Sequence, residues 1–412
     1  MNPAKQGFLE SLFKKANDLY SRKRYEDAID LYRQILAQYP QEPSVRLNLG
    51  AALFKIGNIE DAYKIFTDLI EEDPTNLNAW LNRGDLLKKS GRYDEAYADF
   101  STACKIDDES AEAHLFLGLL QLLKGDYKEG WKHFGYREKR LKLPGFPFPR
   151  WRAEAGGDRT ILVVTEQGLG DTLQLVRFDA VLRNMGLFPF WSVRTPLVGL
   201  LKQNGIEAFD ERILDTLCEK NSFDFYTYAF DIPAVLEATP ETLYAPSRYL
   251  QTKSTLNVDS SRFNVAFAHK GNPEHAGDRF RSMPLETFAP ILENEKCDFY
   301  STQLDIDQKE LISLKRENLF DTAPLLEDFA DTAAVINSMD LVITVDTSLA
   351  HLAGAMGKPV WLLLPHVPDW RWGLDTSKTP WYPSIELFRQ TAINEWEPVA
   401  QRVVHKLKER TK

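Results

Sequence analysis

The first 140 residues repeat with a period of 34. Tyr25, Ile59, Tyr93 and Tyr127 lie 34 residues apart. A small residue follows each of them by three positions, at Ala28, Ala62, Ala96 and Gly130. A large aromatic residue keeps the same spacing, at Tyr32, Phe66, Phe100 and Phe134. A repeat of this length is one supersecondary unit that buries its apolar face only against the next copy, so the pattern predicts stacked helical hairpins.

These repeats resemble the tetratricopeptide repeat, and we expect an all-α superhelix over residues 1–140. Such an array presents a concave face, normally to a peptide. Asn48 and Asn82 lie 34 residues apart and are expected in that groove, where an amide can donate to and accept from an extended backbone. This resembles the asparagine ladder of O-GlcNAc transferase. The alternative is two polar residues on a solvated helix face, because the next equivalent position is Phe116.

A connector is expected at residues 141–158. Pro144, Pro147 and Pro149 cannot lie within a continuing helix, since proline lacks the backbone N–H. Phe146 and Trp151 lie among or close to them. The pattern predicts an ordered, aromatic-packed segment.

From Arg159 onward, apolar strand-like runs alternate with helical segments. The first set of expected strands is 160–165, 188–193, 206–209 and 223–230, and the second is 263–269, 297–302, 341–345 and a run from Val360. Two such sets predict two doubly wound parallel sheets, in domains at 159–258 and 259–393, followed by a C-terminal helix within 394–412. Ligands of such sheets bind at the carboxyl ends of the strands, so the expected site is the cleft between the two domains.

Three motifs follow expected strands and carry candidate site residues. The first is Gly168-Leu169-Gly170-Asp171, in which glycine lets the backbone approach a ligand and Asp171 either caps a helix or acts in catalysis. It lacks the third glycine of the dinucleotide fingerprint, which disfavours NAD.

The second motif runs from His269 to Pro284 and includes four residues expected to bind a donor: Lys270, Asn272, His275 and Arg281. Cationic and imidazole groups at such an edge suit a diphosphate, whose charge must be neutralised when it leaves. The alternative for Lys270 is a solvated surface loop.

The third motif is the turn Asp346-Thr347-Ser348-Leu349, with His351 one turn into the following helix. The first N–H groups of a helix are unpaired and carry partial positive charge, so they suit phosphate. The alternatives are a strand-helix unit without ligand and, for His351, a packed core residue. An aromatic loop, PDWRW, follows the next strand and either stacks on a ligand or packs internally.

Taken in this order, the motifs resemble those of an inverting glycosyltransferase of the GT-B fold, in the heptosyltransferase-like group fused to tetratricopeptide repeats in bacteria. The matching stretches are EQGLGDT, the segment before Pro284, DLVITVDTSLAHLAGAMGKPVW, and PDWRW with TPWYPSIELFRQ. The resemblance implies Asp171 as the catalytic base, Gly170 beside it and Arg281 as the basic residue. It also implies a donor diphosphate on Thr347, Ser348 and Leu349, with His351 close. Ser348 replaces the glycine usual in that family.

The resemblance therefore implies a metal-independent transferase that moves a sugar from a nucleotide-sugar to a Ser or Thr of a protein held by the repeats, and at the family level it suggests flagellin or another surface protein as the acceptor. Asp305-Ile306-Asp307 is interpreted as a helix cap rather than a metal site. Two alternatives remain: a non-catalytic scaffold that binds a nucleotide or sugar, and a transferase acting on a surface glycan. The sequence leaves the sugar, the nucleotide and the acceptor open.

Composition favours a cytoplasmic protein that does not bind nucleic acid. The net charge of −10 disfavours nucleic-acid binding, which requires basic surface. No apolar run suggests a signal peptide or a membrane span. Three widely spaced cysteines, Cys104, Cys218 and Cys297, are typical of reduced thiols and are expected neither to bind metal nor to form disulfides. No cofactor is expected.

Overall fold

A computed structural model describes residues 3–154, 156–242, 248–274, 277–304, 308–314, 316–374 and 377–412. The chain forms two compact units. One contains Met1–Gln121 and Lys132–Lys142, and the other contains Leu122–Trp131 and Leu143–Lys412.

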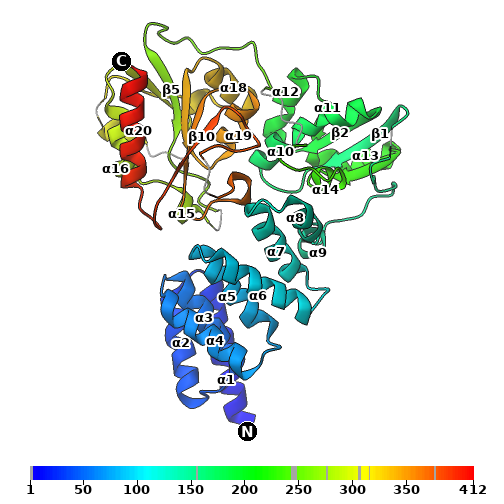
Figure 1. The fold of residues 1–412 in the computed structure, drawn as a ribbon, viewed down its shortest axis with the longest axis vertical. Helices are drawn as coiled ribbons and strands as arrows, with labels where there is room; N and C mark the ends of the chain where they lie inside the picture. The colour runs from blue at the N-terminus through cyan, green and yellow to red at the C-terminus, as the bar shows by residue number, and fades with distance from the viewer. Residues whose placement is uncertain are drawn as a thin grey trace. The chain divides into compact units, whose positions relative to one another are not determined.

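The first unit is built from helical hairpins that follow the 34-residue period (Figure 1). Its helices, with the two that continue into the second unit, are α1 (Pro3–Ser21), α2 (Tyr25–Gln38), α3 (Pro43–Lys55), α4 (Ile59–Glu72), α5 (Leu77–Lys89), α6 (Tyr93–Ile106), α7 (Ala111–Leu123), α8 (Tyr127–Phe134) and α9 (Arg137–Leu141). The predicted repeats are therefore confirmed as helix pairs.

Glycine permits the close crossing of helices within a repeat. A Cβ added to Gly50 would lie 2.7 Å from Cε1 of Phe66, and one added to Gly84 would lie 2.5 Å from Cε1 of Phe100. Both phenylalanines are buried. The period thus pairs a glycine in the leading helix with an aromatic ring in the second helix.

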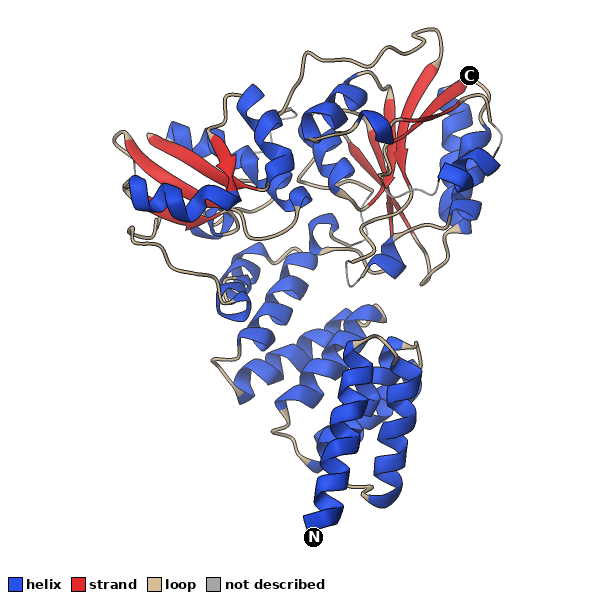
Figure 2. Cartoon of the chain, turned by 180° about the vertical axis from the view of Figure 1, so that it is seen from behind, coloured by secondary structure: helices blue, strands red, loops and turns tan. Residues whose placement is uncertain are grey.

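The second unit contains two parallel sheets, whose strands are drawn in red in Figure 2. The first has the order β3-β2-β1-β4 and comprises β1 (Arg159–Val164), β2 (Leu187–Val193), β3 (Ala208–Asp210) and β4 (Phe225–Tyr228). The second has the order β10-β9-β8-β5-β6-β7 and comprises β5 (Phe263–Ala268), β6 (Cys297–Ser301), β7 (Leu319–Asp321), β8 (Leu341–Val345), β9 (Val360–Leu364) and β10 (Ile385–Arg389).

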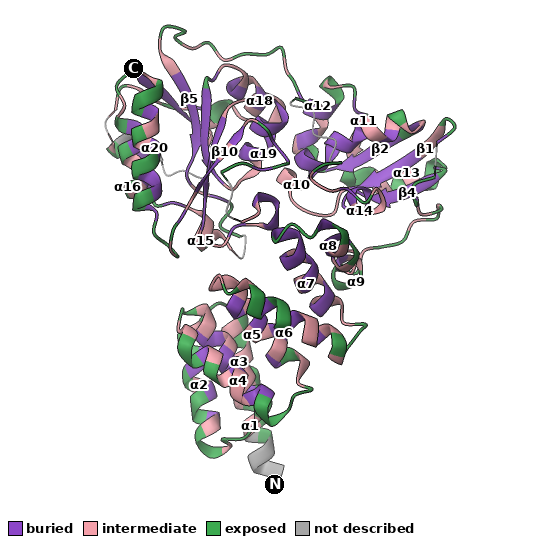
Figure 3. Cartoon of the chain, viewed as in Figure 1, coloured by how far each residue is buried: buried purple, intermediate pink, exposed green. Residues whose placement is uncertain are grey.

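Helices connect the strands of both sheets. The longer ones are α10 (Leu169–Leu175), α12 (Thr195–Gln203), α13 (Leu214–Lys220), α18 (Phe329–Asn337), α19 (Ser348–Ala355) and α20 (Glu397–Arg410). The shorter ones are α11 (Asp179–Asn184), α14 (Asp231–Val235), α15 (Asp278–Arg281), α16 (Leu285–Phe288) and α17 (Gln308–Ser313). Every residue of β8 and β9 is buried, as helices on both faces of a parallel sheet require (Figure 3).

Two strands, β7 and β10, were not predicted from the sequence. β7 has three residues, too few for a periodic signal. β10 follows the proline- and aromatic-rich stretch at 380–383, which reads as a loop. Both lie at the edges of the six-stranded sheet, so they extend it without changing the position of its centre.

The connector is ordered against the first sheet. Tyr226 in β4 donates its N–H to Pro149 O at 2.9 Å and accepts from the Trp151 N–H at 2.9 Å. Phe146 packs edge-on against the Tyr226 ring, with centroids 5.2 Å apart. Trp151 is fully buried. The aromatic residues thus fix residues 146–151 along the edge strand.

Candidate active site at the carboxyl ends of two parallel sheets

Each sheet has one point where its winding reverses. In the first sheet the chain moves from β1 to β2 and β3 on one side and then to β4 on the other. In the second it moves from β5 to β6 and β7, then to β8, β9 and β10 on the opposite side. Crevices form at the carboxyl ends of strands at such switch points. The segments that leave β1, β5 and β8 there contain all three predicted motifs.

Asp171 lies in the first turn of α10, directly after β1. Its Oδ2 accepts the Gly168 N–H at 2.7 Å, which is the predicted cap. Its Oδ1 accepts a short hydrogen bond from Nη2 of Arg371, with which it forms an ion pair. The Asp171 side chain is 20% exposed, so it is not closed off from solvent. A carboxylate has about four lone-pair sites, which leaves room for a substrate hydroxyl.

Arg371 is the central residue that sequence reasoning missed. It lies in the aromatic loop after β9 and is buried. Its Nε donates to Gln174 Oε1 at 2.7 Å, and its Nη1 donates to Asp369 Oδ1 at 2.7 Å. With Asp171 included, the guanidinium reaches both the α10 segment and its own loop. The only sequence signal is a cation between two tryptophans, which indicates neither partner.

Aromatic rings hold the Arg371 loop in place. The guanidinium carbon of Arg371 lies 4.5 Å from the Trp370 ring centroid. Trp370 in turn packs edge-on against Trp131 and Trp381, with centroids 5.4 and 5.6 Å apart. Trp131 Nε1 donates to Ala238 O at 2.8 Å. Trp381 is therefore explained by internal packing, as the sequence favoured. The same packing of aromatic rings orients Arg371.

Asp346 follows β8 and is half-buried. Burial and the nearby Asp369 carboxylate together raise its pKa to about 6, against the opposing effect of the Arg281 and Arg371 guanidiniums. The carboxyl group therefore lies within electrostatic reach of both arginines. Both arginines therefore act electrostatically on the predicted donor turn, and one of them, Arg371, also binds Asp171.

The start of α19 is open in the way a phosphate site requires. Thr347 occupies the N-cap position, but its side chain makes no cap hydrogen bond. Its Oγ1 lies 3.2 Å from Thr344 Oγ1 instead. Within the described residues, the N–H groups of Ser348 and Leu349 have no protein acceptor. These unpaired donors and the helix dipole together attract an anion.

His351 is buried between the two sheets' helices. Its Nδ1 hydrogen-bonds to Tyr382 Oη at 2.8 Å. A Cβ added to Gly170 would lie 2.7 Å from His351 Cδ2, so Gly170 is the point where α10 meets α19. Burial lowers the pKa of His351 well below its usual value, and the nearby Arg371 and Arg177 lower it further. The ring is therefore neutral and positions the two helices.

A second buried arginine, Arg177, also links the α10 side to the second sheet. Its Nη1 donates to Trp381 O at 2.8 Å, and its Nη2 donates to Tyr249 Oη at 3.2 Å. The guanidinium lies 4.8 Å from the Tyr382 ring centroid. It has no role in the predicted motifs, and its contacts join the segment after α10 to the loop before β10.

The loop after β5 orients Arg281. Its Nε donates to Asp278 Oδ1 at 3.1 Å, and Gly271 packs so closely that an added Cβ would lie 2.6 Å from Arg281 Nε. Lys270 Nζ pairs with Glu310 at 3.3 Å, and Asn272 Oδ1 accepts the Glu274 N–H at 2.9 Å. These contacts hold the Lys270 and Asn272 side chains within or beside their own loop, and neither contact involves Asp346.

Two predictions fall on residues outside the described part of the chain, namely His275 and Asp305-Ile306-Asp307. The predicted groove residues lie on α3 and α5. Asn48 Nδ2 donates to Asn17 Oδ1 at 2.9 Å, and Asn82 Nδ2 donates to Asn78 O at 2.9 Å. Each amide therefore uses donor capacity within its own repeat array, and Asn48 also hydrogen-bonds to the Tyr32 hydroxyl.

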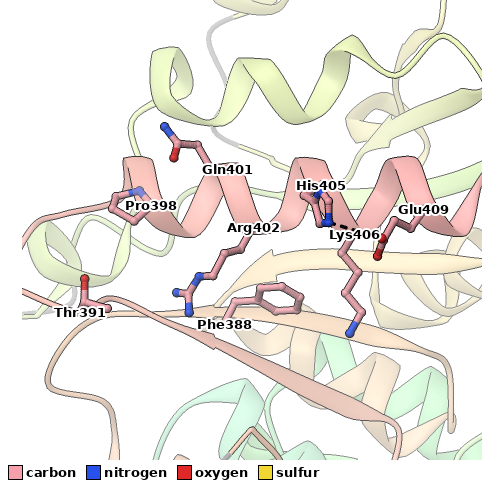
Figure 4. A pocket seen from close by; sticks show the side chains of 8 residues that line it. All are labelled: Phe388, Thr391, Pro398, Gln401, Arg402, His405, Lys406 and Glu409. Carbon is pink, nitrogen blue, oxygen red and sulfur yellow. Dashed lines mark ion pairs between the residues drawn. The ribbon is translucent and has the colours of Figure 1, made fainter.

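A separate hollow lies between β10 and α20 (Figure 4). Phe388, Arg402 and Lys406 are among its lining residues, and His405 pairs with Glu409 at its rim at 3.4 Å. It contains none of the predicted site residues. No helix among the described residues is long and apolar enough to cross a membrane.

Comparison with known proteins defines the class. Residues 19–83 match a tetratricopeptide repeat family and residues 84–125 match a second TPR repeat family. Residues 309–371 match glycosyltransferase family 9 (heptosyltransferase), a segment that includes β8, α19, β9 and Arg371. The chain therefore carries tetratricopeptide repeats followed by a heptosyltransferase-type glycosyltransferase domain, as the sequence predicted.

Individual relatives are more distant. The chain is 25% identical over 300 residues to Protein FlbA of Caulobacter vibrioides, across 66% of this chain and 49% of that protein. It thus spans about half the length of this curated relative. Solved structures with some likeness include a thermophilic tetratricopeptide repeat protein of Thermus thermophilus (20% identity, 32% of this chain, 73% of that chain, TM-score 0.30). Another is MamA of Desulfovibrio magneticus (20% identity, 33% of this chain, 78% of that chain, TM-score 0.30).

Proposed function

We propose that the chain is an inverting glycosyltransferase of GT-B architecture that moves a sugar from a nucleotide-sugar to a Ser or Thr hydroxyl of a protein bound by its repeats. One observation supports this above the others. Asp171 and the open start of α19 come from different switch points, and their helices meet where an added Cβ on Gly170 would lie 2.7 Å from His351 Cδ2. Arg371 pairs with Asp171 and acts electrostatically on Asp346. A base and an anion site on opposite walls are what a direct displacement needs.

The leaving group is assigned to the second sheet. The N–H groups of Ser348 and Leu349 and the Arg281 guanidinium would hold the nucleotide diphosphate. These fixed dipoles and charges stabilise negative charge as it develops on the departing oxygen. No metal is assigned to this step, because protein groups present at the site suffice for charge neutralisation. Lys270, Asn272 and His275 remain predicted contributors to donor binding.

The attacking group is assigned to the first sheet. The acceptor hydroxyl oxygen bonds to the anomeric carbon from the face opposite the diphosphate, and its proton passes to the Asp171 carboxylate. The bond from the anomeric carbon to the diphosphate oxygen breaks, and its electron pair leaves with the diphosphate. The anomeric configuration inverts. Arg371 and the Gly168 N–H fix the Asp171 carboxylate, so its orientation is set before the substrate binds.

The repeats are assigned to the acceptor. Helix-pair arrays form extended concave surfaces, and the side-chain carbonyl oxygens of Asn48 and Asn82 could accept from the N–H groups of a peptide backbone. An acceptor such as flagellin or another surface protein fits this arrangement better than a small glycan does. We place the reaction in the cytoplasm, where nucleotide-sugars are made.

The test uses the full-length chain and a panel of nucleotide-sugars. Calorimetry identifies the donor that binds, and mass spectrometry follows sugar transfer to surface proteins as well as donor hydrolysis. Asp171→Asn should keep donor binding and lower turnover by about 10²- to 10⁴-fold. The matched control is Asp210→Asn, because Asp210 also accepts from a backbone N–H and an arginine, at Arg212.

The outcomes separate the alternatives. Donor binding without transfer or hydrolysis would identify a non-catalytic scaffold. Transfer only to a glycan would reassign the acceptor. A wild-type rate in Asp171→Asn would remove the base assignment alone, and failure of every donor to bind would overturn the proposal.

A further inference from the structure

Three metal-ligand side chains meet in the last repeat, within the first unit. Cys104 comes from α6, His114 from α7 and His133 from α8. Their ligand atoms, one sulfur and two imidazole nitrogens, all lie within 4.8 Å of one another. His114 is buried, while Cys104 and His133 are half-buried, so the cluster is enclosed and still reachable by an ion. Proximity of a thiol and two imidazoles from three helices was not predicted from the sequence.

One hydrogen bond fixes the orientation of His114. Its Nε2 lies 2.9 Å from Asp108 O, and since a carbonyl only accepts, this nitrogen carries the proton. The lone pair of neutral His114 is therefore on Nδ1, which lies 2.7 Å from His133 Nδ1. The Tyr136 ring stacks on the His114 ring, with centroids 3.9 Å apart, and this contact holds the imidazole plane. A metal-binding histidine typically donates its other N–H to a carbonyl in this way.

The preceding repeat shows that the backbone supplies this arrangement. Trp80 occupies the place equivalent to His114, and its Nε1 donates to Pro74 O at 2.9 Å, the carbonyl equivalent to that of Asp108. The places equivalent to Cys104 and His133 are Ile70 and Asp99. Ile70 is apolar and Asp99 pairs with Arg83. Only in the last repeat do all three positions carry metal ligands.

We propose that Cys104, His114 and His133 bind one divalent transition-metal ion, with Zn²⁺ the best match. A thiolate with two imidazoles suits zinc, which prefers sulfur and nitrogen ligands in tetrahedral geometry. Zinc about 2.0–2.1 Å from each nitrogen sets the two Nδ1 atoms about 3.3 Å apart, so the rings separate slightly on binding. A water molecule takes the fourth position.

Binding balances as a deprotonation. The Cys104 thiol releases its proton to solvent and binds as thiolate. His133 moves its Nδ1 proton to Nε2, and both Nδ1 lone pairs then face the ion. The ion would cross-link α6, α7 and α8. This site is independent of the proposed transfer reaction, because its three ligands and the two sheets belong to different compact units.

The experiment uses the full-length chain stripped of metal and titrated with Zn²⁺ by calorimetry and with Co²⁺ by absorption spectroscopy. We expect one equivalent to bind. Co²⁺ should give a sulfur-to-metal charge-transfer band and the visible bands of four-coordination. Cys104→Ser should abolish the charge-transfer band and weaken Zn²⁺ binding beyond the roughly 10- to 100-fold typical of losing a supporting residue.

Cys218→Ser is the matched control, because Cys218 is also a half-buried helical thiol, on α13. It should bind both ions like the wild type. His133→Asn provides a second variant should Cys104→Ser fail to fold, and it should keep the thiolate band with weaker binding. Absence of a thiolate band in the folded wild type, or its loss in Cys218→Ser, would overturn the proposal.

Discussion

Arg371 donates from Nη2 to Asp171 Oδ1 across 200 residues of sequence. The same guanidinium is held by Gln174 on α10 and by Asp369 in its own loop. A planar fork with several donors can bind all three partners at once, which an ammonium cannot. The orientation of the proposed base therefore depends on a residue outside the three sequence motifs.

Arg371→Lys should lower kcat by about 10²-fold, because a misplacement of about 1 Å at a reacting group has that effect. The charge remains, so donor affinity should change little. The measurement is steady-state kinetics once the donor is identified. Arg402→Lys is the control, since Arg402 also donates from Nη2 in α20, to the Arg389 carbonyl. Equal kcat in Arg371→Lys and wild type would show that the fork does not position Asp171.

Gly170→Ala should separate α10 from α19, because the added Cβ would lie 2.7 Å from His351 Cδ2. Overpacking of this kind typically costs about 1–3 kcal/mol. Chemical denaturation followed by tryptophan fluorescence measures the loss. Gly145→Ala is the control, because no atom lies within 4 Å of its added Cβ. Wild-type stability in Gly170→Ala would show that the His351 ring moves aside at no measurable cost in stability.

Asp346→Asn should stabilise the chain at pH 7.5 and lose that advantage at pH 4. The pKa of Asp346 is raised to about 6 in the folded chain by burial, above its usual 3.8. The folded state therefore holds this proton more tightly, and the stability it contributes falls as pH rises from about 4 through 6. Removing the charge should recover up to about 3 kcal/mol above pH 6.

Thermal unfolding across this pH range tests the Asp346 prediction. Asp298→Asn is the control, because Asp298 is a buried carboxylate paired with Arg262, away from the switch point. It should be destabilised at pH 7.5. A stability difference between Asp346→Asn and wild type that does not change with pH would contradict the prediction.

Asn82→Ala should raise KM for the protein acceptor several-fold and leave donor hydrolysis unchanged, if its amide holds the acceptor backbone. Asn221→Ala is a matched control, because its Nδ2 makes the same bond to the carbonyl four residues earlier, to Leu217 O at 3.0 Å. Both variants lose that bond, and only the first loses a groove amide. An unchanged acceptor KM in Asn82→Ala would assign Asn82 to the solvated face.

How far sequence predicts this molecule depends on the range of the interactions. The repeats and most strands follow from local periodicity, and the turn at Asp346–Leu349 follows from a strand meeting a helix. Arg371 could not be found, since its partner Asp171 is distant in sequence. The pairing of Gly170 with His351 is likewise set by how two helices cross. Thr347 is an open N-cap because Thr344 lies within reach of its hydroxyl, which no helix-start pattern indicates.

The strand order also bears on how the molecule forms. The first switch point exists only once β4 has paired with β1, and the second only once β8 has paired with β5. Non-local parallel pairing is intrinsically slow, whereas helical hairpins close through local contacts and form quickly. On renaturation, helical signal from the repeats should return first and catalytic competence last. During synthesis the repeats would emerge before the sheets, so the proposed acceptor groove would form before the proposed transfer site.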